Sequence, residues 1–188
     1  MIEVRNISKS YDSKKVLDDI SFTVNKGECV ALWGASGAGK TTLMRIIAGL
    51  EEADSGEILI KENAKMTYVF QENRLLEGLT ALENITAFVP DKEKAMYYLR
   101  RCLLHEDAHK KAGLFSGGMK RRLAIARALC YGGDIYFLDE PLRELDEETL
   151  TEITSFIKEE ISGKTAVLIT HDETGANILS DRKITISK

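Results

Sequence analysis

The sequence has 188 residues, of which 44% are hydrophobic and 30% charged, a composition typical of a globular chain with a substantial core. The formal net charge of −4, from 26 basic and 30 acidic residues, argues against a general electrostatic attraction to nucleic acid or anionic lipid. No apolar run reaches the roughly 18 residues of a membrane-spanning helix, and residues 1–5 lack the features of a signal peptide. We therefore expect one domain in the cytoplasm.

The three cysteines are consistent with a reducing compartment. Their positions, Cys29, Cys102 and Cys130, have no metal-ligand spacing. Cys29 and Cys130 lie in apolar runs and are predicted to be buried thiols.

The first part of the chain has β character. Residues 2–5 and 16–24 are predicted strands, followed by a turn at 25–28 and an apolar strand at 29–33. A helix is expected over 43–48, with Gly49 as its C-terminal cap. Residues 57–60 and 66–70 are further predicted strands.

A glycine-rich loop separates the strand at 29–33 from the helix that follows it. The loop consists of Gly34, Ala35, Ser36, Gly37, Ala38, Gly39, Lys40, Thr41 and Thr42. Its glycines let successive N–H groups point at phosphate oxygens, and the helix start adds its positive dipole end. Lys40 is predicted to reach the β- and γ-phosphates, and the Thr41 hydroxyl to hold Mg²⁺. The strand–loop–helix order predicts a nucleoside triphosphate site.

The middle of the chain has helical character. Thr80 and Glu83 form a predicted capping box for a helix toward Val89. Asp91 is expected to cap a second helix, whose apolar positions are Ala95, Met96, Leu99 and Leu103. A third helix is expected from about Gly118 to Tyr131. We interpret Lys120, Arg121 and Arg122 as a solvated face of this helix, and His105 and His109 as solvated residues of a polar helical stretch.

The last part returns to alternating strands and helices. A buried strand is predicted at 135–138, a helix at 147–161, a second buried strand at 165–170 and a short strand at 182–186. The pattern predicts an α/β core with a parallel sheet, interrupted by a helical insertion at about 72–133.

Two further groups of residues carry possible chemistry. Asp139 and Glu140 follow the buried strand at 135–138, so Asp139 is predicted to hold Mg²⁺, directly or through water, and Glu140 to polarise an attacking water. Ser116, Gly117 and Gly118 open a helix and leave N–H groups free for an anion.

Taken in order, these motifs resemble those of the ATP-binding cassette (ABC) ATPases over essentially the whole chain. Residues 34–42 resemble Walker A, residues 115–119 the signature motif, and residues 138–140 Walker B. Gln71 falls at the Q-loop, residues 145–146 at the D-loop and His171 at the switch histidine.

The resemblance implies a P-loop NTPase (RecA-like) core with an N-terminal antiparallel β subdomain and an inserted α-helical subdomain. The core covers about 1–71 and 134–188 of a single ABC ATPase domain, and the insertion covers about 72–133. The implied catalytic residues are Glu140, His171, Gln71 and Lys40, and Mg²⁺ is held by Thr41, Gln71 and Asp139. Tyr11 and Val16 pack on adenine, the whole loop 34–42 binds ATP, and Ser116, Gly117 and Gly118 bind the nucleotide of a second chain.

The implied function is that of the ATP-binding and ATP-hydrolysing subunit of an ABC transporter. Its partners are a transmembrane permease and a second ATPase chain, identical or a close paralogue, without nucleic acid. It meets the membrane only through the permease, at the inner face of the cell membrane. The motifs are closest to short importer-type cassettes, but the direction of transport stays open. A soluble ABC-type ATPase acting on ribosomes or DNA and a non-transport ATP-binding regulatory protein are the alternatives.

Some positions depart from the family pattern. The signature has Phe115 and Met119 at its ends, where leucine and glutamine are usual. Arg143 and Glu144 replace small residues of the D-loop, a change expected to affect contacts between two chains. No room for a regulatory C-terminal domain is expected after Lys188.

Overall fold

The computed structural model describes residues 1–187, and its centre is a five-stranded parallel sheet. The strands are β3 (Cys29–Trp33), β5 (Met66–Val69), β6 (Ile135–Asp139), β7 (Thr165–Ile169) and β8 (Arg182–Thr185), in the order β5-β6-β7-β3-β8. Every residue of β6 and β7 is buried, as their continuous apolar sequences predict for strands covered on both faces.

The two faces of the parallel sheet belong to two apolar clusters because side chains alternate along each strand. Val30, Phe137 and Val167 lie in the cluster that contains helix α1 (Lys40–Ile47). Ala31, Leu138 and Leu168 lie in the other cluster. That second cluster contains the buried faces of α2 (Ala81–Thr86), α3 (Lys92–Arg101), α4 (Gly117–Tyr131), α5 (Glu147–Ile161) and α6 (Glu173–Leu179). A short 3₁₀ helix, η1 (Ala112–Leu114), precedes α4.

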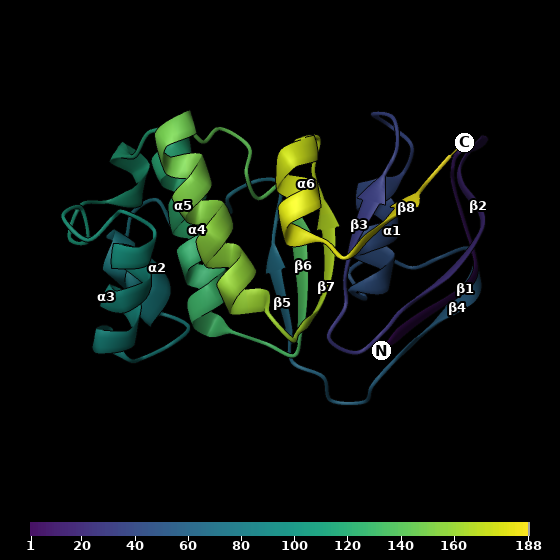
Figure 1. The fold of residues 1–188 in the computed structure, drawn as a ribbon, viewed down its shortest axis with the longest axis horizontal. Helices are drawn as coiled ribbons and strands as arrows, with labels where there is room; N and C mark the ends of the chain where they lie inside the picture. Colours follow the sequence, from purple (N-terminus) through teal and green to yellow (C-terminus); the bar gives the residue numbers. More distant parts are fainter. Residues whose placement is uncertain (188) are drawn as a thin grey trace.

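An antiparallel sheet covers the α1 side. Its strands are β1 (Ile2–Tyr11), β2 (Lys14–Val24) and β4 (Ser55–Ile60), in the order β2-β1-β4. Figure 1 shows this sheet on one side of the parallel sheet and α2–α5 gathered on the other, with both chain termini on the antiparallel side. The strands are longer than predicted because β1 stays paired with β2 through register shifts after Val4 and Ile7.

Helix ends follow local sequence where a capping residue is present. Thr80 and Glu83 form the predicted capping box, and the Asp91 carboxylate accepts the N–H of Lys94. Gly49, with φ 69°, follows the cap residue Ala48 and ends α1 in the left-handed conformation.

Two helical expectations differ from the structure. Leu103 is not on α3: it has φ 57°, and the N–H groups of Leu103 and Leu104 bond back to Arg100 and Leu99. This non-glycine Schellman turn buries Cys102 and Leu104 on either side of it. Helix α6 was not predicted because its short sequence buries little besides Ala176 and Leu179.

The expectation of buried thiols at Cys29 and Cys130 is confirmed within residues 1–187, and Cys102, for which burial was not predicted, is also free and buried. None of the helices in this part of the chain is long and apolar enough to cross a bilayer.

The close approach of β4 to β1 gives a stability prediction. Gly56 has φ 92°, and a Cβ there would lie 2.5 Å from the Asn6 carbonyl oxygen, whereas a Cβ at Gly78 would meet no atom within 4 Å. We expect Gly56→Ala to lower the free energy of unfolding by about 2 kcal/mol or more, from backbone strain and overpacking. Urea unfolding followed by Trp33 fluorescence measures it. Gly78→Ala is the matched control, and equal effects of the two substitutions would contradict this account.

Candidate active site

The candidate site lies where the carboxyl ends of four parallel strands meet. The glycine loop follows β3, Gln71 follows β5, Glu140 follows β6 and His171 follows β7. Parallel strands bring these ends to one edge, so segments far apart in the chain converge without long connections. They surround a cavity of about 350 Å³.

Most of the predicted nucleotide-site residues line this cavity. The lining comprises Tyr11, Val16, Ser36, Gly37, Gly39, Lys40, Thr41, Thr42, Gln71, Asp139, Glu140, Ile169 and His171. Of these, only Ile169 was not predicted; as the last residue of β7 it gave no polar signal. Gly34, Ala35 and Ala38 of the predicted loop lie outside the lining.

Glycine is required where the loop approaches its neighbours. Gly39 has φ 91° and is the N-cap of α1, and a Cβ on it would lie 2.8 Å from a methyl group of Leu17. Gly34 has φ 150°, and a Cβ there would overlap the Ile186 carbonyl oxygen beside β8. These contacts hold the loop against both sheets, so its backbone shape is fixed before any ligand arrives.

Lys40 is the cation of the cavity. Its side chain is largely buried, and Nζ donates to the carbonyl oxygens of Gly34 at 2.8 Å and Ala35 at 2.9 Å. An ammonium group in this position can exchange carbonyl partners for phosphate oxygens with a change in side-chain torsions.

Asp139 places a buried carboxyl next to the glycine loop. It is 1% exposed, and its Oδ1 lies 3.5 Å from the Thr41 hydroxyl. Burial, and then the charge of Glu140, raise the pKa of Asp139 to about 6. No cation within residues 1–187 forms an ion pair with it, so the ionised carboxylate lacks the compensation that a buried charge needs.

These donors fit Mg²⁺. A hydroxyl, a carboxylate and the Gln71 side-chain oxygen are hard oxygen ligands, and Mg²⁺ usually binds one or two carboxylates together with substrate phosphates. Among the described residues, no group of three or more His, Cys, Asp or Glu side chains is arranged to hold a metal ion.

Glu140 has a strained backbone. Its φ is 51°, its N–H donates to the Ile169 carbonyl oxygen at 2.8 Å, and its carboxylate accepts the N–H of His171 at 3.3 Å. His171 Nε2 lies 3.3 Å from the other carboxylate oxygen; the glutamate side chain is 12% exposed and the imidazole 62%. A left-handed conformation is uncommon for glutamate and turns the side chain toward the cavity here.

Tyr11 lies at the end of β1, on the antiparallel-sheet side of the cavity. The tyrosine is 45% exposed, and its hydroxyl hydrogen-bonds to Glu51. Val16, from β2, also lines the cavity. The tyrosine therefore lines the cavity beside the glycine loop, with the Lys9 ammonium 5.6 Å from the ring centroid.

The signature residues are not part of this cavity. Ser116 accepts the N–H of Met119 at 3.3 Å and caps α4 as predicted. Gly117 and Gly118 lie against Glu144, which has φ 65°. Ser116, Gly117 and Gly118 thus form a separate helix start, while the D-loop residues Arg143 and Glu144 are exposed.

The interpretation of residues 120–122 as a solvated face was wrong. Arg121 is 2% exposed, Arg122 donates to the carbonyls of Cys102 and Leu103, and Lys120 pairs with Glu77. The missed signal was spacing: Arg121 shares a helical face with the buried Ala124, Ile125 and Ala128.

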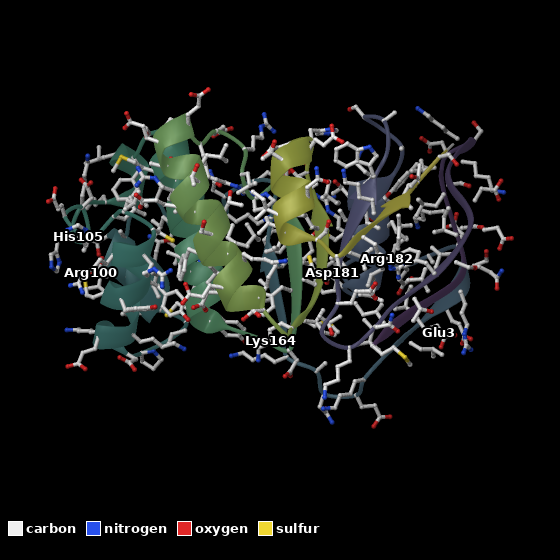
Figure 2. All side chains as sticks on the ribbon, viewed as in Figure 1. Glu3, Arg100, His105, Lys164, Asp181 and Arg182 are labelled. Carbon is white, nitrogen blue, oxygen red and sulfur yellow. The ribbon has the colours of Figure 1, made fainter. Side chains whose placement is uncertain are left out.

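The histidine interpretation was partly correct. Figure 2 shows His105 at the outer edge of the helical part, away from the parallel sheet, and its side chain is 47% exposed. It lies in a turn after α3 and not in a helix. His109 is also exposed and outside a helix.

Comparison with known proteins agrees with the fold. The chain matches the family model described as ABC transporter over residues 17–143. It is 36% identical to the spermidine/putrescine import ATP-binding protein PotA of Pasteurella multocida, covering 100% of this chain and 56% of the relative. It is also 36% identical to the phosphonates import ATP-binding protein PhnC of Fusobacterium nucleatum, covering 97% and 87% respectively.

A solved structure shows the same architecture. The dimeric post-hydrolysis state of the ATP-binding cassette MJ0796, bound to ADP and Pi, superposes with a TM-score of 0.90 at 29% identity, covering 100% of this chain and 94% of that one. The fold and the motifs define the chain as an ATP-binding cassette with a P-loop NTPase core, as expected. The chain belongs to the ABC transporter family, and the resemblance is confirmed. It spans just over half the length of PotA.

The raised pKa of Asp139 predicts a pH dependence. Between about pH 4 and pH 6 the folded state holds a proton that the unfolded state releases, so the free energy of unfolding falls as the pH rises through this range. A cation bound to the carboxylate offsets that loss. With ADP present, we expect Mg²⁺ to raise the Tm more at about pH 7.5 than at about pH 5.5.

Asp139→Asn should abolish this difference in a thermal-shift titration, whereas Asp18→Asn, on an exposed carboxylate, should retain it. An Asp139→Asn protein with the same Mg²⁺ response as the wild type would remove Asp139 from the metal site.

Proposed function

We propose that this chain is the ATP-hydrolysing subunit of an ABC importer, working with a permease and a second ATPase chain. The observation that carries the proposal is the convergence of Lys40, Thr41, Gln71, Asp139 and Glu140, with His171, on one cavity. The related PotA and PhnC are named import ATP-binding proteins. Neither name refers to ribosomes, DNA or regulation, so a soluble ATPase acting on ribosomes or DNA and a non-transport regulatory protein are not favoured.

The proposed chemistry is charge neutralisation around the γ-phosphate and activation of a water. The N–H groups of residues 34–42 and the Lys40 ammonium bind the phosphates. Thr41, Asp139 and Gln71 would hold Mg²⁺, which supplies further positive charge at the phosphates when bound. Glu140 accepts the proton of the attacking water, and His171 donates a hydrogen bond to the γ-phosphate.

A second chain completes the site in this proposal. Ser116, Gly117 and Gly118 lie outside the cavity of their own chain, with Glu144 beside the two glycines, so we assign their helix start to the nucleotide bound by a partner. The solved cassette MJ0796 is dimeric with ADP and Pi. We assign the core to about 1–71 and 134–188 and the insertion to about 72–133.

A groove beside the Q-loop is the proposed docking site for the permease. It has a volume of about 320 Å³ and a mostly apolar lining. Its walls are formed by Met66, Thr67, Tyr68, Phe70, Arg74, Phe88, Arg127, Ala128 and Tyr131. Phe88 is 54% exposed there and Tyr131 40%, and exposed apolar side chains gathered in one groove are typical of an interaction site. Docking at this groove would place the chain at the inner face of the cell membrane.

The cargo is proposed to be selected by the other subunits. PotA and PhnC are each 36% identical to this chain, yet their names concern polyamines and phosphonates. A similar cassette therefore serves chemically unlike cargoes, which favours a motor role for this chain.

Glu140→Gln tests the proposed hydrolysis. The amide keeps the shape of the side chain but cannot accept the water proton, so we expect kcat to fall by about a hundredfold or more with little change in ATP affinity. Size-exclusion chromatography with light scattering should then show a dimer in Mg-ATP. Glu152→Gln, on the exposed face of α5, is the control and should behave like the wild type. Full turnover by Glu140→Gln would refute the assignment.

Tyr11→Ala tests adenine recognition by stacking. Base–aromatic stacking contributes about 1–3 kcal/mol, so we expect the KM for ATP to rise by about tenfold, with a smaller fall in kcat. Tyr97→Ala removes a tyrosine of similar exposure outside the cavity (44% against 45%) and should leave the KM unchanged. If the two variants have the same KM, Tyr11 does not contact the base.

A further inference from the structure

Arg121 is a buried cation that the proposed chemistry does not use. It is 2% exposed, in the second turn of α4. Its guanidinium donates hydrogen bonds to oxygen atoms of Pro141, Phe70, Asn73, Asp139 and Glu140, at distances between 2.6 and 3.3 Å. None of these acceptors is a carboxylate, and within residues 1–187 no carboxylate forms an ion pair with it. The positions of these five acceptors show which segments Arg121 holds in place.

Three of the acceptors are consecutive backbone carbonyls. Arg121 Nη2 donates to Asp139 O at 2.7 Å and to Glu140 O at 2.6 Å, and Nε donates to Pro141 O at 3.1 Å. Carbonyls of adjacent residues normally diverge along an extended chain. Here the left-handed backbone of Glu140, with φ 51°, turns them toward one point. A planar cation with several donors suits such a point.

The remaining two acceptors flank Gln71. Arg121 Nη1 donates to Phe70 O at 2.6 Å and to Asn73 Oδ1 at 3.3 Å. One side chain therefore bridges the segment after β5, which carries Gln71, and the segment after β6, which carries Glu140. Both Gln71 and Glu140 line the cavity.

We propose that Arg121 is a positioning residue for hydrolysis: its guanidinium holds Glu140 in the left-handed conformation that directs the carboxylate into the cavity, and fixes Gln71 relative to it. Arg121 does not touch the nucleotide in this proposal. The inference rests on the proposed function, because it assumes that Glu140 serves the hydrolysis of ATP.

The energetics support a specific role. Burial lowers the pKa of Arg121 to about 10, partly offset by the nearby Asp139, and the side chain still carries its charge at neutral pH. A buried guanidinium without an ion pair is unfavourable unless its hydrogen bonds are satisfied, and here it has five acceptors. Purely structural helix packing would be served better by an apolar side chain of similar size.

The position of Arg121 also connects Glu140 to the signature residues. Ser116 caps the same helix five residues earlier, with α4 running continuously through both positions. A shift of the helix start on contact with a second chain would move the guanidinium and the three carbonyls bound to it. Arg121 is thus placed to link the signature helix to the backbone of Glu140.

The experiment compares Arg121→Met, which removes every donor at similar length, with Arg121→Gln, which keeps an amide donor group. Steady-state hydrolysis of Mg-ATP and the Kd for ADP are measured on the folded full-length chain. For Arg121→Met we expect kcat to fall by about tenfold or more, with the Kd and KM within about twofold of the wild type, since a displaced catalytic group affects turnover more than binding. Arg121→Gln should recover most of the lost kcat.

Arg122→Gln is the matched control, because Arg122 bonds carbonyls of the α3 end and not of the site; its kcat should be unchanged. If Arg121→Met does not fold, Arg121→Lys is used in its place. We expect its kcat to be lower than that of Arg121→Gln and higher than that of Glu140→Gln. A folded Arg121→Met protein with wild-type kcat, or one losing ADP affinity in proportion to kcat, would overturn the inference while leaving the proposed function intact. A wild-type chain that binds ATP without hydrolysing it would overturn both.

Discussion

The register of the parallel sheet is the constraint on which the site depends. Leu32 of β3 pairs with Ile169 of β7, and Ile169 pairs with Asp139 of β6, so the ends of three strands form one row. The row sets the glycine loop beside the acidic strand end, although about 100 residues of chain separate them. Because both faces of the sheet are buried, a strand cannot slip without exposing apolar side chains. The edge where ligands bind in open α/β sheets is thereby fixed.

The same edge concentrates charges that are unfavourable to bury. Asp139 and Arg121 are almost fully buried, and within residues 1–187 the guanidinium bonds the Asp139 backbone carbonyl but forms no ion pair with its carboxylate. Asp139 has a pKa raised to about 6, whereas Arg121 is surrounded by carbonyls. The unbalanced carboxyl is suited to a cation that arrives with the phosphates, and the arginine is satisfied permanently. Neither arrangement is what packing alone would favour, so both indicate function.

The walls of the cavity differ in their exposure to solvent. The glycine loop is pressed between both sheets at Gly34 and Gly39. Elsewhere in the lining, the imidazole of His171 is 62% exposed, and outside the cavity the D-loop residues Arg143 and Glu144 are exposed as well. Exposed groups of this kind suit the proposed site, which a second chain completes. A side chain that is bonded to water can exchange that water for atoms of the second chain when the two chains close.

Features that depend on neighbouring residues could be predicted from the order of amino acids. The glycine loop, the capping box of α2, the cap at Asp91 and the buried strands were all predictable, since each is set by contacts within a few residues. The family resemblance followed from the order of such local motifs. Tertiary structure alone decided the burial of Arg121, the end of α3 at a left-handed Leu103 and the hydrogen bond between Tyr11 and Glu51. Arg121 and Tyr11 contact residues that are distant in the sequence, and the turn at Leu103 forms because Cys102 and Leu104 pack in the core. The type of a residue does not reveal which distant segment will fold against it.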